Sequence, residues 1–184
     1  MAGPSDMIES VTCDVQRRAT AYNHRMPDDE SLMIELDDAQ LILIVVGAHL
    51  RAEVGDRPLA YKLHNRISAW LDKRSEMLDL TIVPVVCCDV WYMNQQALHG
   101  RPTISVGGPG VNALSAYFSQ KLPAALARDD HLIVQLDAEF VDLRACIWGM
   151  DHAQTVRAAD LFVEKYLDGY LRAVATQVEP MGES

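Results

Sequence analysis

The sharpest chemical feature of this 184-residue chain is a glycine-rich turn between an apolar run and a helical pattern. Residues 103–107 (TISVG) predict a strand, and Gly108, Pro109 and Gly110 follow it, with Asn112 two residues later. A strand that enters glycines and then a helix leaves backbone N–H groups at a positive helix end, which suits an anion. The Lys-Ser/Thr pair of a phosphate-binding loop is missing, and Pro109 removes one donor. Anion binding and a tight packing turn both fit, and Asn112 could cap the helix instead of touching a ligand.

A cysteine nucleophile is a second chemical hypothesis. Cys87, Cys88 and Asp89 follow one another at the end of another apolar run. Catalysis by Cys87 or Cys88, together with Asp89, would need a thiolate, a nearby base such as His49 or His152, and an oxyanion site, which the amides of residues 108–110 could supply. The spacing does not determine these contacts, and a buried cysteine is commonly an inert small hydrophobe. A hydrolase or transferase therefore stays open as an alternative, and so does the absence of any catalysis.

Two helix starts supply the remaining candidate residues. Asp151 and Gln154 have the spacing of a capping box, with Thr155 next to them, so Asp151 fits either a cap or a ligand contact. Asp56 and Arg57 stand at the predicted start of another helix, with Asp56 as its cap. Arg57 is the cation that we expect to meet an anion, through a bidentate contact.

The elements that must position these residues alternate between strands and helices. Apolar and β-branched runs predict strands at 41–47, 80–87, 103–107, 131–136 and 144–148. Helical spacing predicts helices at 6–22, 56–76, 111–122 and 151–176. The alternation predicts an α/β fold: a three-layer, mostly parallel sheet of about five strands with helices on both faces, of the flavodoxin or Rossmann type. Ligands then bind beyond the carboxyl ends of the strands, where the candidate residues gather.

Three details of this sheet follow from single residues or short spacings. The run 41–47 is continuously apolar, which is typical of a strand buried on both faces. Pro84 has no N–H to donate, so the strand that contains it should lie at an edge or carry a bulge. The strands at 131–136 and 144–148 are close enough to form an antiparallel pair or to flank a short crossover.

Length and composition predict a globular chain with one domain. Hydrophobic residues make up 49%, too many for a disordered chain. We expect an N-terminal helix and acidic segment over residues 1–40, one α/β domain over 41–177 and a frayed tail over 178–184. The formal charge is −10, from 16 Lys+Arg against 26 Asp+Glu, which argues against nucleic acid as a partner. Residues 27–40 hold six of the acids and no base.

Further patterns concern location and cofactors. The longest apolar run, 41–46, is far shorter than the roughly 20 residues of a membrane span, and the first 30 residues have no signal-like apolar region, so we expect no membrane partner. The adjacent Cys87 and Cys88 favour a reducing compartment and hence the cytoplasm. His49 and Glu53 have the i, i+4 spacing without an evident third ligand, so we expect no metal and no cofactor.

Two short stretches resemble a known family. Residues 106–112 (VGGPGVN) are similar to the G-G-P-x-x-N turn in the α/β domain of archaeal S-layer proteins. Residues 147–151 (IWGMD), with Thr155 and Ala158, resemble the strand, glycine, acidic residue and helix start of that domain. Together they span residues 103–159, 57 of the 184. The resemblance implies a parallel α/β arrangement in which the two loops are neighbours, and assembly or binding in place of catalysis.

The patterns together favour binding of a small anionic ligand or a protein partner at the loops that follow the strands. The predicted binding residues are Gly108, Gly110, Asn112, Asp151, Thr155, Arg57 and Asp56. The Cys88, Asp89, His49 and His152 site is one alternative. The other is a non-catalytic interaction or self-assembly module, including a homo-oligomer, in which residues 27–40 and the aromatic loop 89–93 contact other chains.

Overall fold

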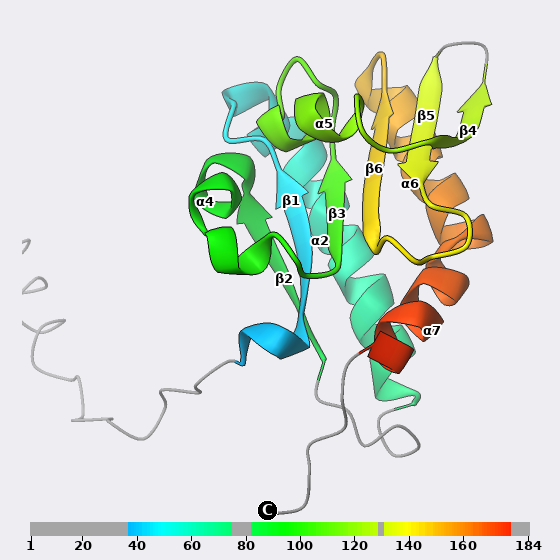
Figure 1. The fold of residues 1–184 in the computed structure, drawn as a ribbon. Coiled ribbons are helices and arrows are strands. Elements are labelled where there is room, and N and C mark those ends of the chain that lie inside the picture. The colour runs from blue at the N-terminus through cyan, green and yellow to red at the C-terminus, as the bar shows by residue number, and fades with distance from the viewer. Residues whose placement is uncertain (1–36, 75–81, 129–130, 178–184) are drawn as a thin grey trace, which may run out of the picture. The chain divides into compact units, whose positions relative to one another are not determined.

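The computed structural model describes residues 37–74, 82–128 and 131–177 (Figure 1). The helix predicted over 6–22 and the tail 178–184 lie outside these residues. The strands are β1 (Leu41–Val46), β2 (Val83–Cys88), β3 (Thr103–Val106), β4 (Ala124–Arg128), β5 (Leu132–Leu136) and β6 (Arg144–Gly149). The helical elements are η2 (Asp38–Gln40), α2 (Leu50–Asp72), α4 (Asp89–Asn94), η3 (Gln96–Leu98), α5 (Ala113–Phe118), α6 (His152–Lys165) and α7 (Leu167–Gln177).

The strands form one sheet in the order β2-β1-β3-β6-β5-β4. Strands β2, β1, β3 and β6 pair in parallel, whereas β5 is antiparallel to β6 and β4 is antiparallel to β5. The prediction of an α/β fold with a mostly parallel sheet is confirmed, and the last two predicted strands form the antiparallel pair. The described residues contain six strands where about five were expected. Strand β4 was not predicted, because its sequence, AALAR, contains no β-branched or aromatic residue.

Strand β1 is buried along its whole length, as its apolar run predicted. Its side chains alternate between two hydrophobic clusters because successive residues of a strand point to opposite faces. Ile42 and Ile44 pack in a cluster with residues of α2, α6 and α7. Leu43 and Val45 pack in a second cluster with residues of α4 and α5. The longer helices thus cover one face of the sheet and the two six-residue helices cover the other (Figure 1).

Pro84 lies in β2, which forms one edge of the sheet. Each residue of β2 pairs only with β1, so the missing N–H of Pro84 breaks no ladder on the outer side. The predicted edge position is confirmed.

Helix α2 begins six residues before the predicted start. His49 is its N-cap, with Nδ1 accepting a hydrogen bond from the N–H of Arg51 at 3.1 Å. Asp56 is therefore not a cap, and Pro58 stands inside the helix. Proline leaves the carbonyl of residue 54 without its helical partner. Val54 is 83% exposed, so water can reach this turn, which explains why the helix continues through the proline.

The C-terminal helix predicted over 151–176 is two helices. The backbone of Tyr166 departs from helical geometry between α6 and α7, with φ −120° and ψ −27°. Its hydroxyl donates to the carbonyl of Ala125 at 3.3 Å, and the hydroxyl of Tyr170 in α7 donates to the carbonyl of Leu143 at 2.9 Å. A continuous apolar stripe in the sequence does not reveal such a break. Helix α5 is also shorter than the predicted 111–122.

Within the described parts of the chain, no helix is long and apolar enough to cross a membrane.

Candidate functional site

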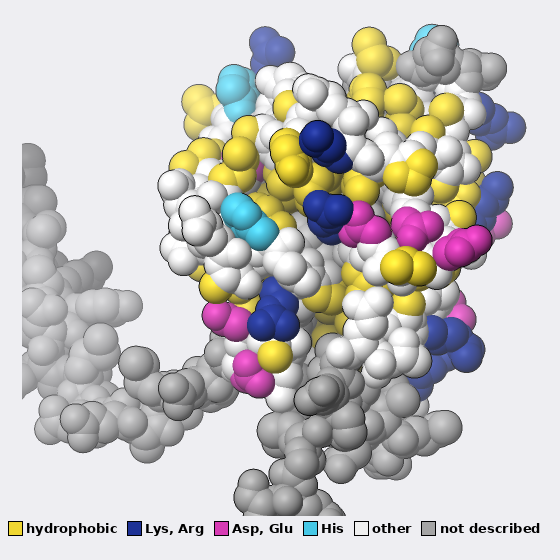
Figure 2. All heavy atoms as spheres, in the orientation of Figure 1, with side chains coloured by type: hydrophobic (Ala, Val, Ile, Leu, Met, Phe, Trp, Pro, Cys, Tyr) yellow, Lys and Arg dark blue, Asp and Glu magenta, His cyan; other side chains and the backbone are white. Residues whose placement is uncertain are grey.

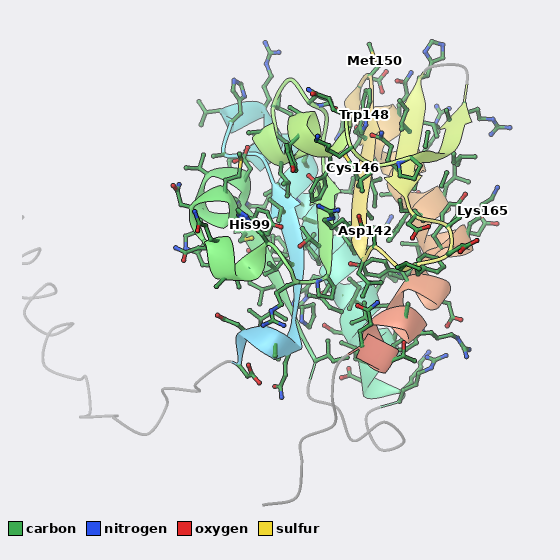
Figure 3. The ribbon with its side chains drawn as sticks, in the orientation of Figure 1. His99, Asp142, Cys146, Trp148, Met150 and Lys165 are labelled. Atoms are coloured by element: carbon green, nitrogen blue, oxygen red, sulfur yellow. The ribbon has the colours of Figure 1, made fainter. Side chains whose placement is uncertain are left out.

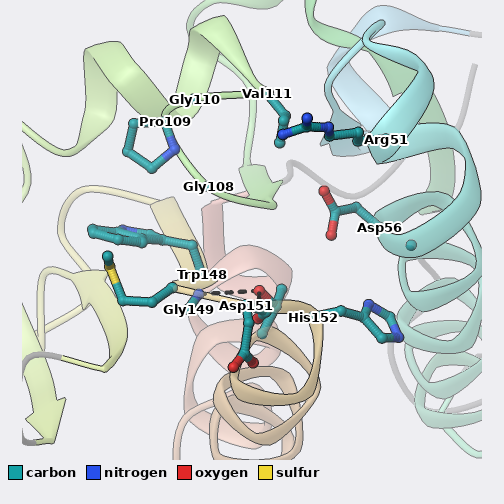
Figure 4. Close-up of a pocket in the computed structure, with 13 residues that line it drawn as sticks. Arg51, Asp56, Gly108, Pro109, Gly110, Val111, Trp148, Gly149, Asp151 and His152 are labelled. Atoms are coloured by element: carbon teal, nitrogen blue, oxygen red, sulfur yellow. Dashed lines mark hydrogen bonds between the residues drawn. The ribbon is translucent and has the colours of Figure 1, made fainter.

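A cavity of about 430 Å³ lies beyond the carboxyl ends of β3 and β6 (Figure 4). Its walls come from the first turns of α2, the glycine turn after β3, and the segment that joins β6 to α6. Six predicted site residues line it, namely Asp56, Gly108, Gly110, Asp151, His152 and Thr155. The loops after β3 and β6 are neighbours here because their strands pair directly.

The glycine turn presents backbone to the cavity. The N–H groups of Val111 and Asn112 donate to the carbonyl of Gly108, at 3.0 and 3.1 Å. In the described part of the chain, the N–H groups of Gly108 and Gly110 donate to no protein atom. Gly107 has φ +101°, and a Cβ there would lie 2.4 Å from Oδ2 of Asp56. Glycine at this position therefore allows both the turn and the close approach of the Asp56 carboxylate.

Asn112 supports the turn from beneath and does not line the cavity. Its side chain is 1% exposed, and its Nδ2 donates to the carbonyls of Val45 and Val106, at 3.2 and 2.9 Å. Its Oδ1 accepts from the N–H groups of Leu114 and Ser115, at 3.0 and 3.2 Å. Asn112 thus caps α5 and connects β1 with β3, which is the structural alternative for this residue.

The start of α6 forms the floor of the cavity. Oδ1 of Asp151 accepts from the N–H of Gln154 at 2.8 Å, so the predicted cap is confirmed. The hydroxyl of Thr155 donates to the Asp151 carbonyl at 2.9 Å and accepts from the N–H of Gly149 at 3.1 Å. The earlier N–H groups of the helix, at its positive end, stay available beside the cavity.

Asp56 is the unusual residue of the site. It is 8% exposed, it makes no hydrogen bond with any described residue, and its carboxylate points into the cavity (Figure 4). Burial raises the pKa of Asp56 above its ordinary value, and the positive charge of His152 opposes that shift. The His152 ring lies against Gly55, where a Cβ would come within 3.1 Å of Nδ1. Buried carboxylates normally have hydrogen-bond donors, so this one is available for a ligand.

The cation at the site is Arg51, not the predicted Arg57. Nε and Nη2 of Arg57 donate to the carboxylate of Glu53, at 2.6 and 2.7 Å, and Arg57 does not line the cavity. Arg51 does line it, and no ion pair holds its guanidinium within the described residues. Arg51 reaches the cavity because α2 begins at Leu50, which places residue 51 in the first helical turn.

Trp148 and Met150 form an apolar wall that sequence reasoning missed. Both line the cavity: Trp148 lies near the end of β6 and Met150 directly follows that strand, whereas Cys146 lies in its middle (Figure 3). Cys146 is fully buried, as its position in an apolar run indicates. The available signal for Trp148 was a large aromatic residue at a strand end in a chain with only 7% aromatic residues.

The residues of the cysteine hypothesis do not all line this cavity. Cys88, Asp89 and His49 do not line the cavity, and His152 does. Burial and the neighbouring Cys88 raise the pKa of Cys87 to about 12, so its thiol stays protonated at neutral pH. His49 uses Nδ1 to cap α2.

Asp89 has a structural role. It is 4% exposed, and its two carboxylate oxygens accept three backbone hydrogen bonds. The donors are the N–H groups of Ala48, Val90 and Ala113, at 2.8, 2.8 and 2.7 Å. These residues lie in the segments that follow β1, β2 and β3, so one carboxylate connects three loops. That arrangement commits the carboxylate to backbone groups.

The described residues contain no group of three or more His, Cys, Asp or Glu side chains that could hold a metal ion. No protein-family model matches the chain, and no curated protein matches it significantly.

We predict that Asp89→Ala destabilises the protein by about 3 kcal/mol, because it leaves buried N–H groups without an acceptor. Urea denaturation measures the change. Asp160→Ala is the matched control: it removes an aspartate from an exposed ion pair with Lys62 and should change the unfolding free energy by about 0.5 kcal/mol or less. Equal midpoints for the two variants would contradict the connecting role of Asp89.

We also predict that Asp56→Asn stabilises the ligand-free protein by about 1 kcal/mol at pH 7. With the pKa of Asp56 raised in the folded state, ionisation near neutral pH favours unfolding, and this disadvantage disappears as pH falls toward the ordinary value of 3.8. The gain should therefore shrink between pH 7 and pH 4 in urea titrations. The exposed Asp160→Asn should show no such gain, and a destabilised Asp56→Asn at pH 7 would refute the expectation.

Proposed function

We propose that the protein binds a small anionic ligand in the cavity beyond β3 and β6. The observation that carries the proposal is that unused donors meet at one cavity: the N–H groups of Gly108 and Gly110 and the guanidinium of Arg51 have no acceptor among the described residues. The buried Asp56 carboxylate also lacks a protein partner, which indicates that the same ligand carries a hydrogen-bond donor. The anion itself would meet the N–H groups of Gly108 and Gly110, the positive end of α6, and Arg51.

The place of the cavity in the sheet supports the proposal. The chain moves from β1 to β2 on one side and then to β3 on the other side of β1. In open α/β sheets, ligands bind outside the carboxyl ends of the strands near such a reversal. We assign the fold to the three-layer flavodoxin or Rossmann type on this reversal and on the helices that cover both faces.

The size of the cavity and the surface charge favour a small molecule over a nucleic acid. A volume of about 430 Å³ lies within the range of roughly 300–1,000 Å³ that is typical of small-molecule sites. On the face that carries α4 and α5, Lys and Arg side chains are scattered among apolar and acidic ones and form no continuous stripe (Figure 2). We place this binding in the cytoplasm, a proposal supported by the free thiols of Cys87 and Cys88.

A protein contact is a second candidate function, favoured by exposed apolar residues on α4 and α5. Trp91, Met93 and Tyr117 are 44%, 46% and 50% exposed. Tyr92 is 3% exposed and fills the core, so the aromatic loop offers one of its two large rings to a partner. A strict monomer in light scattering, with no co-purifying protein, would weigh against this function.

Arg51→Ala and Arg57→Ala distinguish the observed site from the arginine that the sequence favoured. A thermal-shift screen of the full chain would use phosphate, sugar phosphates, nucleoside monophosphates and small carboxylates, including amino acids. We expect at least one anion to raise the melting temperature saturably. Arg51→Ala should weaken its binding about tenfold, the effect of losing one charge-assisted hydrogen bond.

Arg57→Ala is the control and should change the affinity less than about twofold, because Arg57 pairs with Glu53. The proposal fails if no anion in the screen shifts the melting transition, or if Arg57→Ala has the larger effect.

A further inference from the structure

The charges around the cavity are balanced. Asp56 and Asp151 bring two carboxylates to its lining, and Arg51 and His152 bring two basic side chains. A phosphate dianion would meet the N–H groups of the turn but would also lie beside both carboxylates, which repel it. A ligand with no net charge, whose own positive and negative groups are separated, suits this lining better than a polyanion.

The carboxylate of Asp56 determines the positive group of such a ligand. An ionised carboxylate accepts hydrogen bonds and donates none, so its partner must be a donor. A metal ion needs several ligands, and among the described residues no group of three suitable side chains surrounds Asp56. A primary ammonium supplies three N–H donors and one positive charge, which together satisfy a buried carboxylate.

The negative group has its partners on the same side of the cavity. Arg51 and Asp56 both come from α2, five residues apart, and both point into the cavity from that helix (Figure 4). Gly108 of the glycine turn lies between Asp56 and Trp148 (Figure 4). A carboxylate one carbon away from the ammonium could therefore reach Arg51 or the turn while the ammonium contacts Asp56.

The opposite wall is apolar. Trp148 and Pro109 lie across the cavity from Asp56 (Figure 4), and Met150 also lines the cavity. Trp148 is partly buried, and Met150 is 69% exposed. Such a wall would accept an apolar or aromatic side chain of the ligand, and the indole face would also attract a nearby cation.

We propose that the ligand is an α-amino acid with an apolar or aromatic side chain, held by its ammonium on Asp56, its carboxylate on Arg51 and the glycine turn, and its side chain against Trp148. This inference rests on the proposed anion site and adds the ammonium group to it. The ammonium would also place a positive charge beside the buried Asp56 carboxylate, whose pKa is raised by burial in the ligand-free protein.

The test is calorimetric titration of the full chain with four matched compounds. These are phenylalanine, 3-phenyllactate with a hydroxyl in place of the ammonium, 3-phenylpropanoate with neither, and phenethylamine without the carboxylate. The same series built on leucine covers an aliphatic side chain. For at least one series, we expect the amino acid to bind at least tenfold more tightly than each of its three analogues.

Asp56→Asn tests the residue behind this preference. It removes the negative charge and keeps the size of the side chain, so we expect the amino acid to lose at least tenfold in affinity while 3-phenylpropanoate binds as before or better. The exposed Asp160→Asn should retain the wild-type preference. Melting curves of both variants establish that they are folded.

The outcomes separate this inference from the proposed function. If phosphates or deaminated acids bind as tightly as the amino acids, the anion site stands and the ammonium proposal is wrong. If Asp56→Asn retains the preference for the amino acid, Asp56 is not its partner and the proposal is also wrong. If no anionic compound of either panel binds, the proposed function fails, and this inference fails with it.

Discussion

One carboxylate connects the loops on which the candidate site depends. Asp89 accepts from the N–H groups of Ala48, Val90 and Ala113, and thereby holds together the segments that follow β1, β2 and β3. Asn112 adds a second connection between β1 and β3 through the carbonyls of Val45 and Val106. These two buried side chains provide hydrogen-bond partners for backbone groups that the ends of parallel strands leave without ladder partners. The position of the glycine turn, and with it one wall of the cavity, follows from these contacts.

Asp56 is an exception among the buried polar residues of the described chain, because its carboxylate has no hydrogen-bond partner in the protein. No fully buried side-chain nitrogen or oxygen atom of the described residues lacks a hydrogen-bond partner. Asp56 escapes full burial because its carboxylate meets the cavity, yet burial still raises its pKa. A group that destabilises the empty protein and has no structural partner is characteristic of binding sites, where stability and function oppose each other. Asp89, with a similar exposed fraction, shows the opposite case of a carboxylate used for folding.

Local patterns predicted what depends on local sequence. The apolar run of β1, the edge position of Pro84 and the cap at Asp151 each rest on one segment, and each is confirmed. Features decided by distant contacts were missed, such as the break at Tyr166, whose hydroxyl bonds to Ala125. Arg51 was not predicted because its position beside the cavity depends on where α2 begins. Asp56 followed by Pro58 has the pattern of a helix start, so the predicted start of α2 was too late in the sequence.

The early start of α2 also explains why Asp56 is free for a ligand. At the predicted start, Asp56 would have been an N-cap, and its carboxylate would have accepted the first N–H groups of its own helix. Because His49 takes that role, Asp56 stands in the second turn, where backbone groups are satisfied within the helix. Its side chain then has no local acceptor role, and the absence of a Cβ at Gly107 lets it approach the glycine turn. The start of α2 at Leu50 also places Arg51 in the first helical turn, beside the cavity. The position of this helix start therefore accounts for both charged groups that the ligand hypothesis needs.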